Sequence, residues 1–404
     1  MEKWMLGGIK ALSFTHYLQG PSAAQTLADL GAEVVKIEPP NGAYERHWSG
    51  SNAFKNGISA FFMMAHRNQR GMVVDLKARG AADIVKRIAS EYDVVIQNFK
   101  VGVMERLGIG YEELKSVNPK LIYCCCSGEG PTGPRAKGAG QDLLAQSVSG
   151  LAAITGNGDK PPTPVGISVV DQHGAALAAL GIIAALFNRS RTGEGCRVDC
   201  SLLNAALDLQ IESVAYYLNG GQLTERPATG LSTRFHQSPY GVYKTADSCL
   251  TVSLTPFHKL REAFSSGALD EFVPSDQMEK RLAFDRVVAA ELLKRTTAEW
   301  MDIFTRIGVW HAPVLDYPQV FNDPQVLHNQ VTVEVGNEES GTFTVLGHPN
   351  RYNGKSPAVR RNPPRLDEHT DEILGEAGYS REQIAVLRKT GVVGRKESSH
   401  GVSQ

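Results

Sequence analysis

Residues 8–40 read GIKALSFTHYLQGPSAAQTLADLGAEVVKIEPP, and this stretch decides the fold class. Residues 9–14 and 33–37 are short runs rich in apolar residues, as in strands that are buried on both faces. Residues 22–30, between them, have the apolar spacing of a helix, and the proline pair at the end stops the second strand. A strand, a helix and a second strand in this order predict a βαβ unit in a parallel sheet.

The same alternation continues to about residue 125. Further strands are expected at residues 71–76, 93–97 and 121–126, and a helix at residues 81–92 has apolar residues on one face. Short strands that alternate with helices of this length predict an α/β fold with a mostly parallel sheet.

The pattern changes after residue 200. Residues 201–218 read as one long helix, and a smaller α+β unit is expected between residues 237 and 327. A strand region at residues 331–346 and a last helix at residues 380–389 follow, separated by proline-rich extended chain. The composition therefore indicates more than one folding unit.

Charge and cysteine content exclude several classes of protein. The 404 residues include 42 basic and 43 acidic ones, a formal net charge of −1, so no footprint for nucleic acid or an anionic membrane is present. The longest apolar stretch, residues 175–187, is shorter than the roughly 20 residues that span a bilayer, and predicts a buried helix. Three of the six cysteines are consecutive, which suits neither disulfides nor a CxxC metal site. We expect a cytoplasmic protein.

Asp171 is the one formal charge in residues 168–186, SVVDQHGAALAALGIIAAL. Aspartate is among the best helix caps, so the sequence predicts an N-cap here. A second role is compatible with the first. Backbone N–H groups and the helix dipole favour an ionised carboxylate, which can form a covalent intermediate.

Gly128-Glu-Gly130-Pro-Thr-Gly133 matches the GxGxxG spacing of dinucleotide-binding turns. Prolines on both sides of Gly133 predict an irregular loop in place of the helix that such a turn requires. His16 is interpreted either as a hydrogen-bonded structural histidine or as an acid-base or ligand-contacting group. Basic residues recur near strand ends, where ligands of open α/β sheets bind: Arg46, Arg67, Arg70, Lys77, Lys100, Arg106, Arg135 and Lys137.

Six segments, in order along nearly the whole chain, resemble the class III CoA-transferases, the family of formyl-CoA:oxalate and carnitine CoA-transferases. They are residues 8–40, 98–114 (NFKVGVMERLGIGYEEL), 121–134 (LIYCCCSGEGPTGP), 166–199 (GISVVDQHGAALAALGIIAALFNRSRTGEGCRVD), 238–247 (SPYGVYKTAD) and 363–380 (PPRLDEHTDEILGEAGYS). The resemblance implies a homodimer of two interlocked chains. Each chain would have a Rossmann-like large α/β domain, built by residues 1–220 and the C-terminal return 331–404, and a smaller α+β domain, residues 221–330 with its linkers.

The resemblance also implies the chemistry. Asp171 lies at the family's catalytic position, where the carboxylate attacks an acyl-CoA thioester to give an aspartyl anhydride and then an aspartyl-CoA thioester. A dry site would protect the anhydride from water, and helix N–H groups would stabilise each oxyanion. Gly174 is expected to leave room for the ligand. CoA and its esters are then substrates, no metal is required, and no nucleic acid or membrane partner is implied.

The expected contacts to CoA follow position by position from the resemblance. They are His16, Tyr17, Leu18, Gln19, Val74, Asp75, Leu76, Lys77, Asn98, Phe99, Lys100, Arg106 and Lys137. Pro39 stands where relatives often have a CoA-binding arginine, so that contact is lost or is supplied by Arg46. Gln97 and Val101 depart from the family's ENFxPG segment.

Two alternatives remain open within this resemblance. A 2-methylacyl-CoA racemase on the same fold would need a histidine at residue 141, where this chain has Gln141, whose amide does not titrate. His16 or His173 would have to replace it. A CoA-binding protein without turnover is the other alternative. The acids exchanged are not readable from the sequence, and succinyl-CoA is expected as the donor only from common usage in the family.

Overall fold

The computed structural model describes residues 4–223 and 225–396. The end of the expected C-terminal return, residues 397–404, lies outside the described part of the chain. The chain forms two compact units. The large unit contains the residues up to Ala145, Ser168–Ala206 and the chain from Gln330 onward, and the small unit contains Gln146–Ile167 and Leu207–Asn329.

The large unit is built on a six-stranded sheet in which every pairing is parallel. The predicted parallel α/β fold is therefore confirmed. The sheet has the order β5-β2-β1-β6-β7-β8. Its strands are β1 (Lys10–Phe14), β2 (Glu33–Glu38), β5 (Gln69–Val73), β6 (Val94–Gln97), β7 (Ile122–Ser127) and β8 (Cys196–Ser201).

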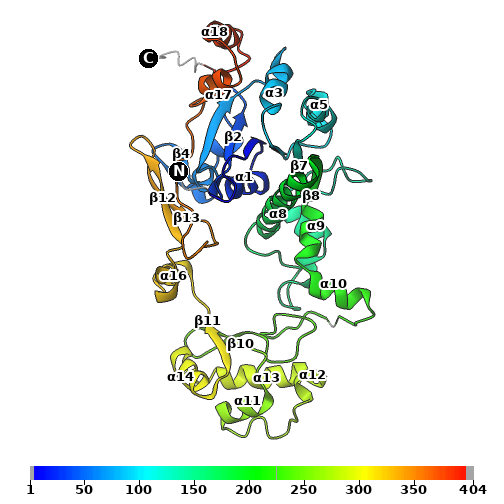
Figure 1. Ribbon diagram of the computed structural model, residues 1–404. Coiled ribbons are helices and arrows are strands. Elements are labelled where there is room, and N and C mark those ends of the chain that lie inside the picture. The colour runs from blue at the N-terminus through cyan, green and yellow to red at the C-terminus, as the bar shows by residue number, and fades with distance from the viewer. Residues whose placement is uncertain (1–3, 224, 397–404) are drawn as a thin grey trace, which may run out of the picture. The chain divides into compact units, whose positions relative to one another are not determined.

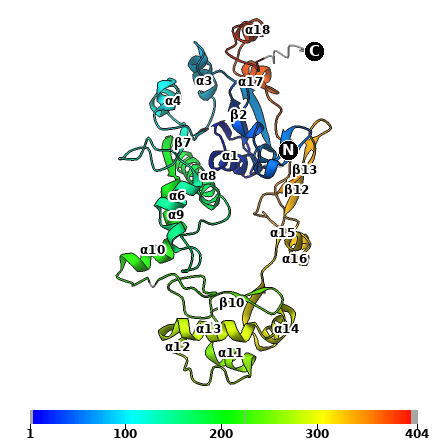
Figure 2. The same ribbon diagram turned by 180° about the vertical axis from the view of Figure 1, so that it is seen from behind.

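Helices cover both faces of this sheet because successive strand residues point to opposite sides. Ala11 of β1 packs with α1 (Gln19–Asp29) and α8 (Val169–Thr192) on one face. Its neighbours Leu12 and Phe14 pack on the other face. The helices there are α3 (Ala81–Ala89), α5 (Tyr111–Val117), α17 (Thr370–Glu376) and α18 (Arg381–Lys389). Figures 1 and 2 show α1 and α8 side by side.

The strand order reverses between β1 and β6. The chain runs from β1 outward to β2 and β5, and then returns to the other side of β1 to add β6, β7 and β8. In open parallel sheets, ligands bind outside the carboxyl ends of the strands at such a switch point. A ligand site is therefore expected at the loops after β1 and β6, which begin with Thr15 and Asn98.

Helix α8 is only partly the buried helix that the sequence predicted. Val170, Gly174, Ala178 and Ile182 on its inner face are buried, whereas Leu180 and Phe187 on the opposite face are 62% and 66% exposed. By length and composition alone, α8 is the one helix in the described part of the chain that could cross a membrane. Its contacts with α1, β7 and β8 make it a packing helix of the sheet.

The remaining elements of the large unit are short. They are η1 (Tyr44–Arg46), η2 (Gly50–Asn52), β3 (Phe54–Lys55), β4 (Ile58–Ser59), α2 (Ala60–Met64), α4 (Val103–Arg106), β12 (Thr332–Asn337) and β13 (Gly341–Leu346). β12 and β13 pair as a hairpin in the predicted strand region 331–346. α6 (Asp142–Val148) and α9 (Leu202–Asp208) lie at the boundaries between the two units.

The small unit has an antiparallel sheet of order β11-β10-β9 packed against helices, as the sequence predicted for an α+β unit. Its elements are α7 (Leu151–Ile154), α10 (Ile211–Leu218), β9 (Gly241–Lys244), β10 (Cys249–Ser253), α11 (Phe257–Phe264), α12 (Asp276–Glu279), α13 (Arg281–Leu292), α14 (Thr297–Ile307), β11 (Trp310–Pro313), α15 (Tyr317–Val320) and α16 (Pro324–Asn329). The prediction of one helix over residues 201–218 is wrong, because the helical pattern is interrupted between α9 and α10.

Candidate active site

The switch point holds together four of the expected CoA contacts. The loop after β1 carries His16 and Tyr17, and the loop after β6 carries Asn98 and Phe99. The Asn98 side chain accepts a hydrogen bond from the His16 N–H (2.9 Å) and donates one to the His16 carbonyl (2.7 Å). The His16 and Phe99 rings lie 5.2 Å apart. Two segments 82 residues apart in sequence thus form one continuous surface at the sheet edge.

The four CoA contacts expected in the loop after β1, residues 16–19, differ in how exposed they are. Tyr17 is 54% exposed, whereas Leu18 and Gln19 are buried where α1 begins. The Gln19 amide donates to Cys200 Sγ at 3.7 Å. A Cβ added to Gly174 would lie 2.6 Å from Gln19 Nε2. The expectation that Gly174 leaves room for the ligand is therefore wrong, because Gln19 occupies that space.

Asp171 lies in the first turn of α8 and is half-buried. The helix begins at Val169, and Ser168 takes the N-cap position without a capping side-chain bond, so the predicted cap at Asp171 is wrong. A different carboxylate holds the helix start. Asp142 Oδ1 accepts the N–H groups of Val170 (2.7 Å) and Asp171 (3.0 Å).

The electrostatics of Asp171 follow from this arrangement. Burial raises its pKa to about 7, and the negative charge of Asp142 acts in the same direction. The sequence favoured the opposite effect, a helix start that keeps the carboxylate ionised. That effect is lost because two of the N–H groups already bind Asp142, a second negative charge. Asp171 is thus a carboxyl group that titrates near neutral pH.

Buried thiols flank this carboxyl group on the sheet. Cys126 of β7 pairs with Cys200 of β8, and both are buried. A hydrogen bond with Cys124 and burial raise the pKa of Cys126 well above its usual range, with Asp171 adding to the effect. Burial raises the pKa of Cys200 to about 12. These neutral thiols make the inner wall apolar, which favours the desolvation seen at Asp171.

Asp142 reaches α8 at the end of a loop that closes on itself. Residues 128–133 form an irregular loop as predicted, and the loop continues to residue 141, with no helix between β7 and α6. A Cβ on Gly140 would lie 2.8 Å from the Gly128 Cα, so the two glycine backbones pack directly against each other at the loop ends. Asp142 was not among the residues predicted for the site, although its neighbour Gln141 was considered. The available signal was an acid at the first residue of a helix.

The other expected contacts lie along the same sheet edge. Val74 is buried and pairs with Val393, and the Asp75 N–H donates to the Val392 carbonyl. Leu76 is partly buried in the core, and Lys77 is exposed. Three further basic residues are exposed: Lys100 after β6, Arg106 in α4 and Lys137 in the closed loop.

The structure separates the basic residues near strand ends into two groups. Arg46, Arg67 and Arg70 are committed to ion pairs inside the large unit, with Glu38, Asp29 and Glu376 respectively. Arg46 also donates to the Pro364 carbonyl and lies over the Phe62 ring. Arg135 pairs with Glu129. The exposed group is left to meet an anionic ligand: Lys77, Lys100, Arg106 and Lys137.

Fold and site together define a class of protein. It is a doubly wound α/β protein with a half-buried carboxyl group at the start of a helix and polar loops at the switch point of its sheet. Among the described residues, no group of three or more His, Cys, Asp or Glu side chains is placed to hold a metal ion. Comparison with known proteins then identifies the family. The chain matches the model of CoA-transferase family III over residues 6–370 and belongs to that family.

Individual relatives support this assignment. The chain is 32% identical to a mouse succinyl-CoA:glutarate CoA-transferase, over 97% of this chain and 91% of the relative. It is 31% identical to a Chloroflexus aurantiacus succinyl-CoA–D-citramalate CoA-transferase, over 96% and 98%. A crystal structure of a CaiB/BaiF family protein from Brucella suis superposes with a TM-score of 0.81 at 27% identity, over 93% of this chain and all of that one. The chain is a family III CoA-transferase.

Proposed function

We propose that this enzyme moves CoA between two carboxylic acids with Asp171 as the nucleophile. The observation that carries the proposal is a carboxyl group with a pKa of about 7 at the carboxyl edge of the sheet, backed by buried thiols. A buried carboxylate of raised pKa is a stronger nucleophile than an ordinary surface carboxylate.

In the first half of the reaction, an Asp171 Oδ atom attacks the thioester carbonyl and the C–S bond breaks. The CoA thiolate leaves, and a mixed anhydride joins Asp171 to the donor acyl group. The thiolate then attacks the aspartyl carbonyl and expels the donor acid as its carboxylate. Asp171 is now a CoA thioester, and no proton has been consumed.

In the second half, the acceptor carboxylate attacks the aspartyl thioester and releases the thiolate again. The thiolate attacks the acyl carbonyl of the acceptor, so the acceptor leaves as its CoA ester and Asp171 is regenerated. Asp142 holds the first turn of α8 in place during these steps. Gln19 is the polar side chain that faces this turn from α1 and is placed to donate to an oxyanion.

We further propose succinyl-CoA as the donor and a short dicarboxylic acid as the acceptor. The support is the names of relatives, which pair succinyl-CoA with glutarate, D-citramalate or mesaconate at 31–33% identity. The racemase alternative has no comparable support. Gln141 stands where the racemase needs a histidine, and its amide has no titratable proton.

We propose that the enzyme acts as a homodimer in the cytoplasm. The support for the homodimer is the apolar outer face of α8, where Leu180 and Phe187 are exposed on a single chain. Ile211 and Leu218 of α10 are likewise 69% and 72% exposed. Apolar side chains gathered in this way mark protein interfaces. Light scattering after gel filtration measures the mass directly, and a monomer would contradict this part of the proposal.

The experiment that tests the mechanism is covalent trapping. The enzyme is incubated with succinyl-CoA alone, treated with hydroxylamine or borohydride, digested and mapped by mass spectrometry. We expect an adduct at Asp171 and none in Asp171→Asn, which should also lack transfer. Transfer that persists in Asp171→Asn would refute the nucleophile. Exchange of the α-proton into deuterated water without exchange of acids would support the racemase instead.

A further inference from the structure

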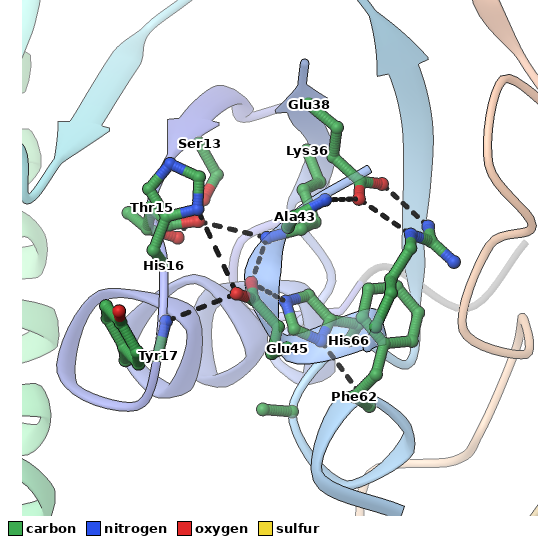
Figure 3. A network of polar contacts seen from close by, with 12 residues as sticks. Ser13, Thr15, His16, Tyr17, Lys36, Glu38, Ala43, Glu45, Phe62 and His66 are labelled. Carbon is green, nitrogen blue, oxygen red and sulfur yellow. Dashed lines mark hydrogen bonds and ion pairs between the residues drawn. The ribbon is translucent and has the colours of Figure 1, made fainter. Parts of the chain in front are cut away.

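A buried ion pair lies beneath the loop after β1 and takes no part in the proposed chemistry (Figure 3). Lys36 belongs to β2, and Glu45 belongs to η1. Lys36 Nζ is 2.8 Å from Glu45 Oε1, and both side chains are 0% exposed. An ion pair at this depth is a poor stabilising device, because removing two charges from water costs about as much as their attraction gains. Its position therefore needs another explanation.

The pair makes its further hydrogen bonds to the backbone of that loop. Lys36 Nζ donates to the Thr15 carbonyl at 3.0 Å, and Glu45 Oε2 accepts the Tyr17 N–H at 3.4 Å. Figure 3 shows the Glu45 carboxylate between the loop and Lys36. The loop is therefore tied to β2 and η1 through two charges that attract each other.

Asn98 holds the same loop from the side of β6. Its amide bonds both the N–H and the carbonyl of His16. Tyr17 has a φ of 61°, a left-handed conformation that is unfavourable for a residue with a Cβ. The hydrogen bonds to Thr15, His16 and the Tyr17 N–H offset the cost of this backbone conformation and restrain the loop.

The neighbouring His66 does not replace Lys36 as the partner of Glu45. Its Nδ1 lies 2.8 Å from the Phe62 carbonyl, which can only accept, so Nδ1 carries the hydrogen. Nε2 then presents a lone pair 3.7 Å from Glu45 Oε1. Burial and the charge of Lys36 hold the pKa of His66 well below its usual value. Lys36 is thus the cation that balances Glu45.

We propose that Lys36 and Glu45 are positioning residues for CoA esters. They set the conformation of the loop at residues 15–17 before substrate arrives, so that binding does not have to order it. The proposal rests on the proposed function and on the contact with CoA that the family resemblance predicts for this loop. Because α1 begins two residues after Tyr17, the same loop also fixes Gln19 against α8.

The test replaces the pair by neutral side chains and measures CoA binding by calorimetry. The double variant Lys36→Met/Glu45→Leu leaves no unpaired buried charge, so folding should persist. We expect its Kd for CoA to rise roughly tenfold, since preorganisation of the loop is lost. The KM for the acyl-CoA should rise in parallel, whereas the KM for the free acid should not change.

A second buried ion pair of the large unit supplies the control. Arg67 Nη2 lies 2.5 Å from Asp29 Oδ2, both side chains are almost fully buried, and they also contact Asn68 and residues 346 and 348. Arg67→Met/Asp29→Leu should therefore leave the Kd for CoA unchanged. Thermal unfolding of both double variants shows whether they lose similar stability.

A conservative variant separates positioning from bulk stability. Lys36→Met/Glu45→Gln keeps an oxygen that can accept the Tyr17 N–H, so it should recover part of the CoA affinity. If Lys36→Met/Glu45→Leu does not fold, the CoA affinity of the Gln variant tests the inference in its place. Wild-type CoA affinity in the Lys36/Glu45 variants, or equal losses in the Lys36/Glu45 and Arg67/Asp29 variants, would overturn the inference. A wild-type enzyme that binds no CoA would overturn the proposed function and this inference with it.

Discussion

Replacement of Asp142 by Asn should shift the acid limb of the pH profile of CoA transfer to lower pH. In the wild-type enzyme the pKa of Asp171 is about 7, and in the proposed mechanism only the carboxylate attacks the thioester. The ionised fraction at pH 6 is then about one tenth, so kcat/KM should lie roughly tenfold below its plateau there. The Asp142→Asn substitution removes the like charge but keeps an oxygen that accepts the N–H groups of Val170 and Asp171.

The size of the shift follows from the geometry. Asp142 Oδ1 is 3.0 Å from the backbone nitrogen of Asp171, and we take about 6 Å as the separation of the two carboxylates. At that separation a unit charge contributes roughly 0.7 to 3 kcal/mol for dielectric constants of about 80 to 20. The midpoint should therefore fall on the order of one pH unit. Burial is the larger cause of the raised pKa, so the Asp142→Asn midpoint should remain above that of an ordinary aspartate.

The assay is steady-state kcat/KM for succinyl-CoA between about pH 5.5 and 9, with a carbon-13 NMR titration of Asp171 in the free enzyme as a direct check. Asp142→Ala is the control for the helix cap, because it removes charge and acceptor together and should cost roughly 0.5–2 kcal/mol of stability. An active Asp142→Asn enzyme with the wild-type midpoint would refute the reasoning. A wild-type profile that is flat across neutral pH would refute it too.

Three further predictions concern the same region. Asp171→Asn should raise the melting temperature more at pH 8 than at pH 5. The pKa of Asp171 is raised from 3.8 to about 7 in the folded protein, so the wild-type protein loses stability as the pH rises from 3.8 to about 7, and the Asn variant avoids this loss. Calorimetry at pH 5 and pH 8 tests the sign. Gly174→Ala should lower kcat/KM roughly 10- to 100-fold at nearly unchanged stability, because the new Cβ would displace the Gln19 amide; kinetics and unfolding of one preparation separate the two effects. Gly140→Ala should cost roughly 1–3 kcal/mol in urea unfolding, because its Cβ would meet the backbone of Gly128.

Local pattern sufficed for most strands of the sheet. The runs at residues 9–14, 33–37 and 93–97 overlap β1, β2 and β6, because strands buried on both faces are nearly continuous apolar runs. The strand at residues 71–76 was placed too late, since β5 begins at Gln69. The break between α9 and α10 was missed, because the apolar spacing continues through it.

The polar partners were not predictable because they join segments distant in sequence. Asp142 caps a helix that begins 27 residues later, and the irregular loop before it gives no periodicity from which to infer the contact. Lysine side chains are mostly exposed, yet Lys36 is 0% exposed, because Glu45 from a separate turn pairs with it. Tertiary contacts of this kind override both residue preference and local pattern.

The raised pKa of Asp171 also affects which of the two carbonyls of the proposed anhydride the CoA thiolate attacks. A free substrate acid has a pKa near that of a glutamate side chain, about 4.3, whereas Asp171 has a pKa of about 7. The weaker base is the better leaving group. Attack of the thiolate on the aspartyl carbonyl would expel the donor acid, whereas attack on the donor carbonyl would expel Asp171. The first of these two attacks is therefore favoured. Burial thus favours the aspartyl-CoA thioester over return to the starting acyl-CoA. The same bias slows release of the second CoA ester, because that step must expel Asp171. In the proposed mechanism, the site would therefore retain CoA as the aspartyl thioester until an acceptor acid arrives.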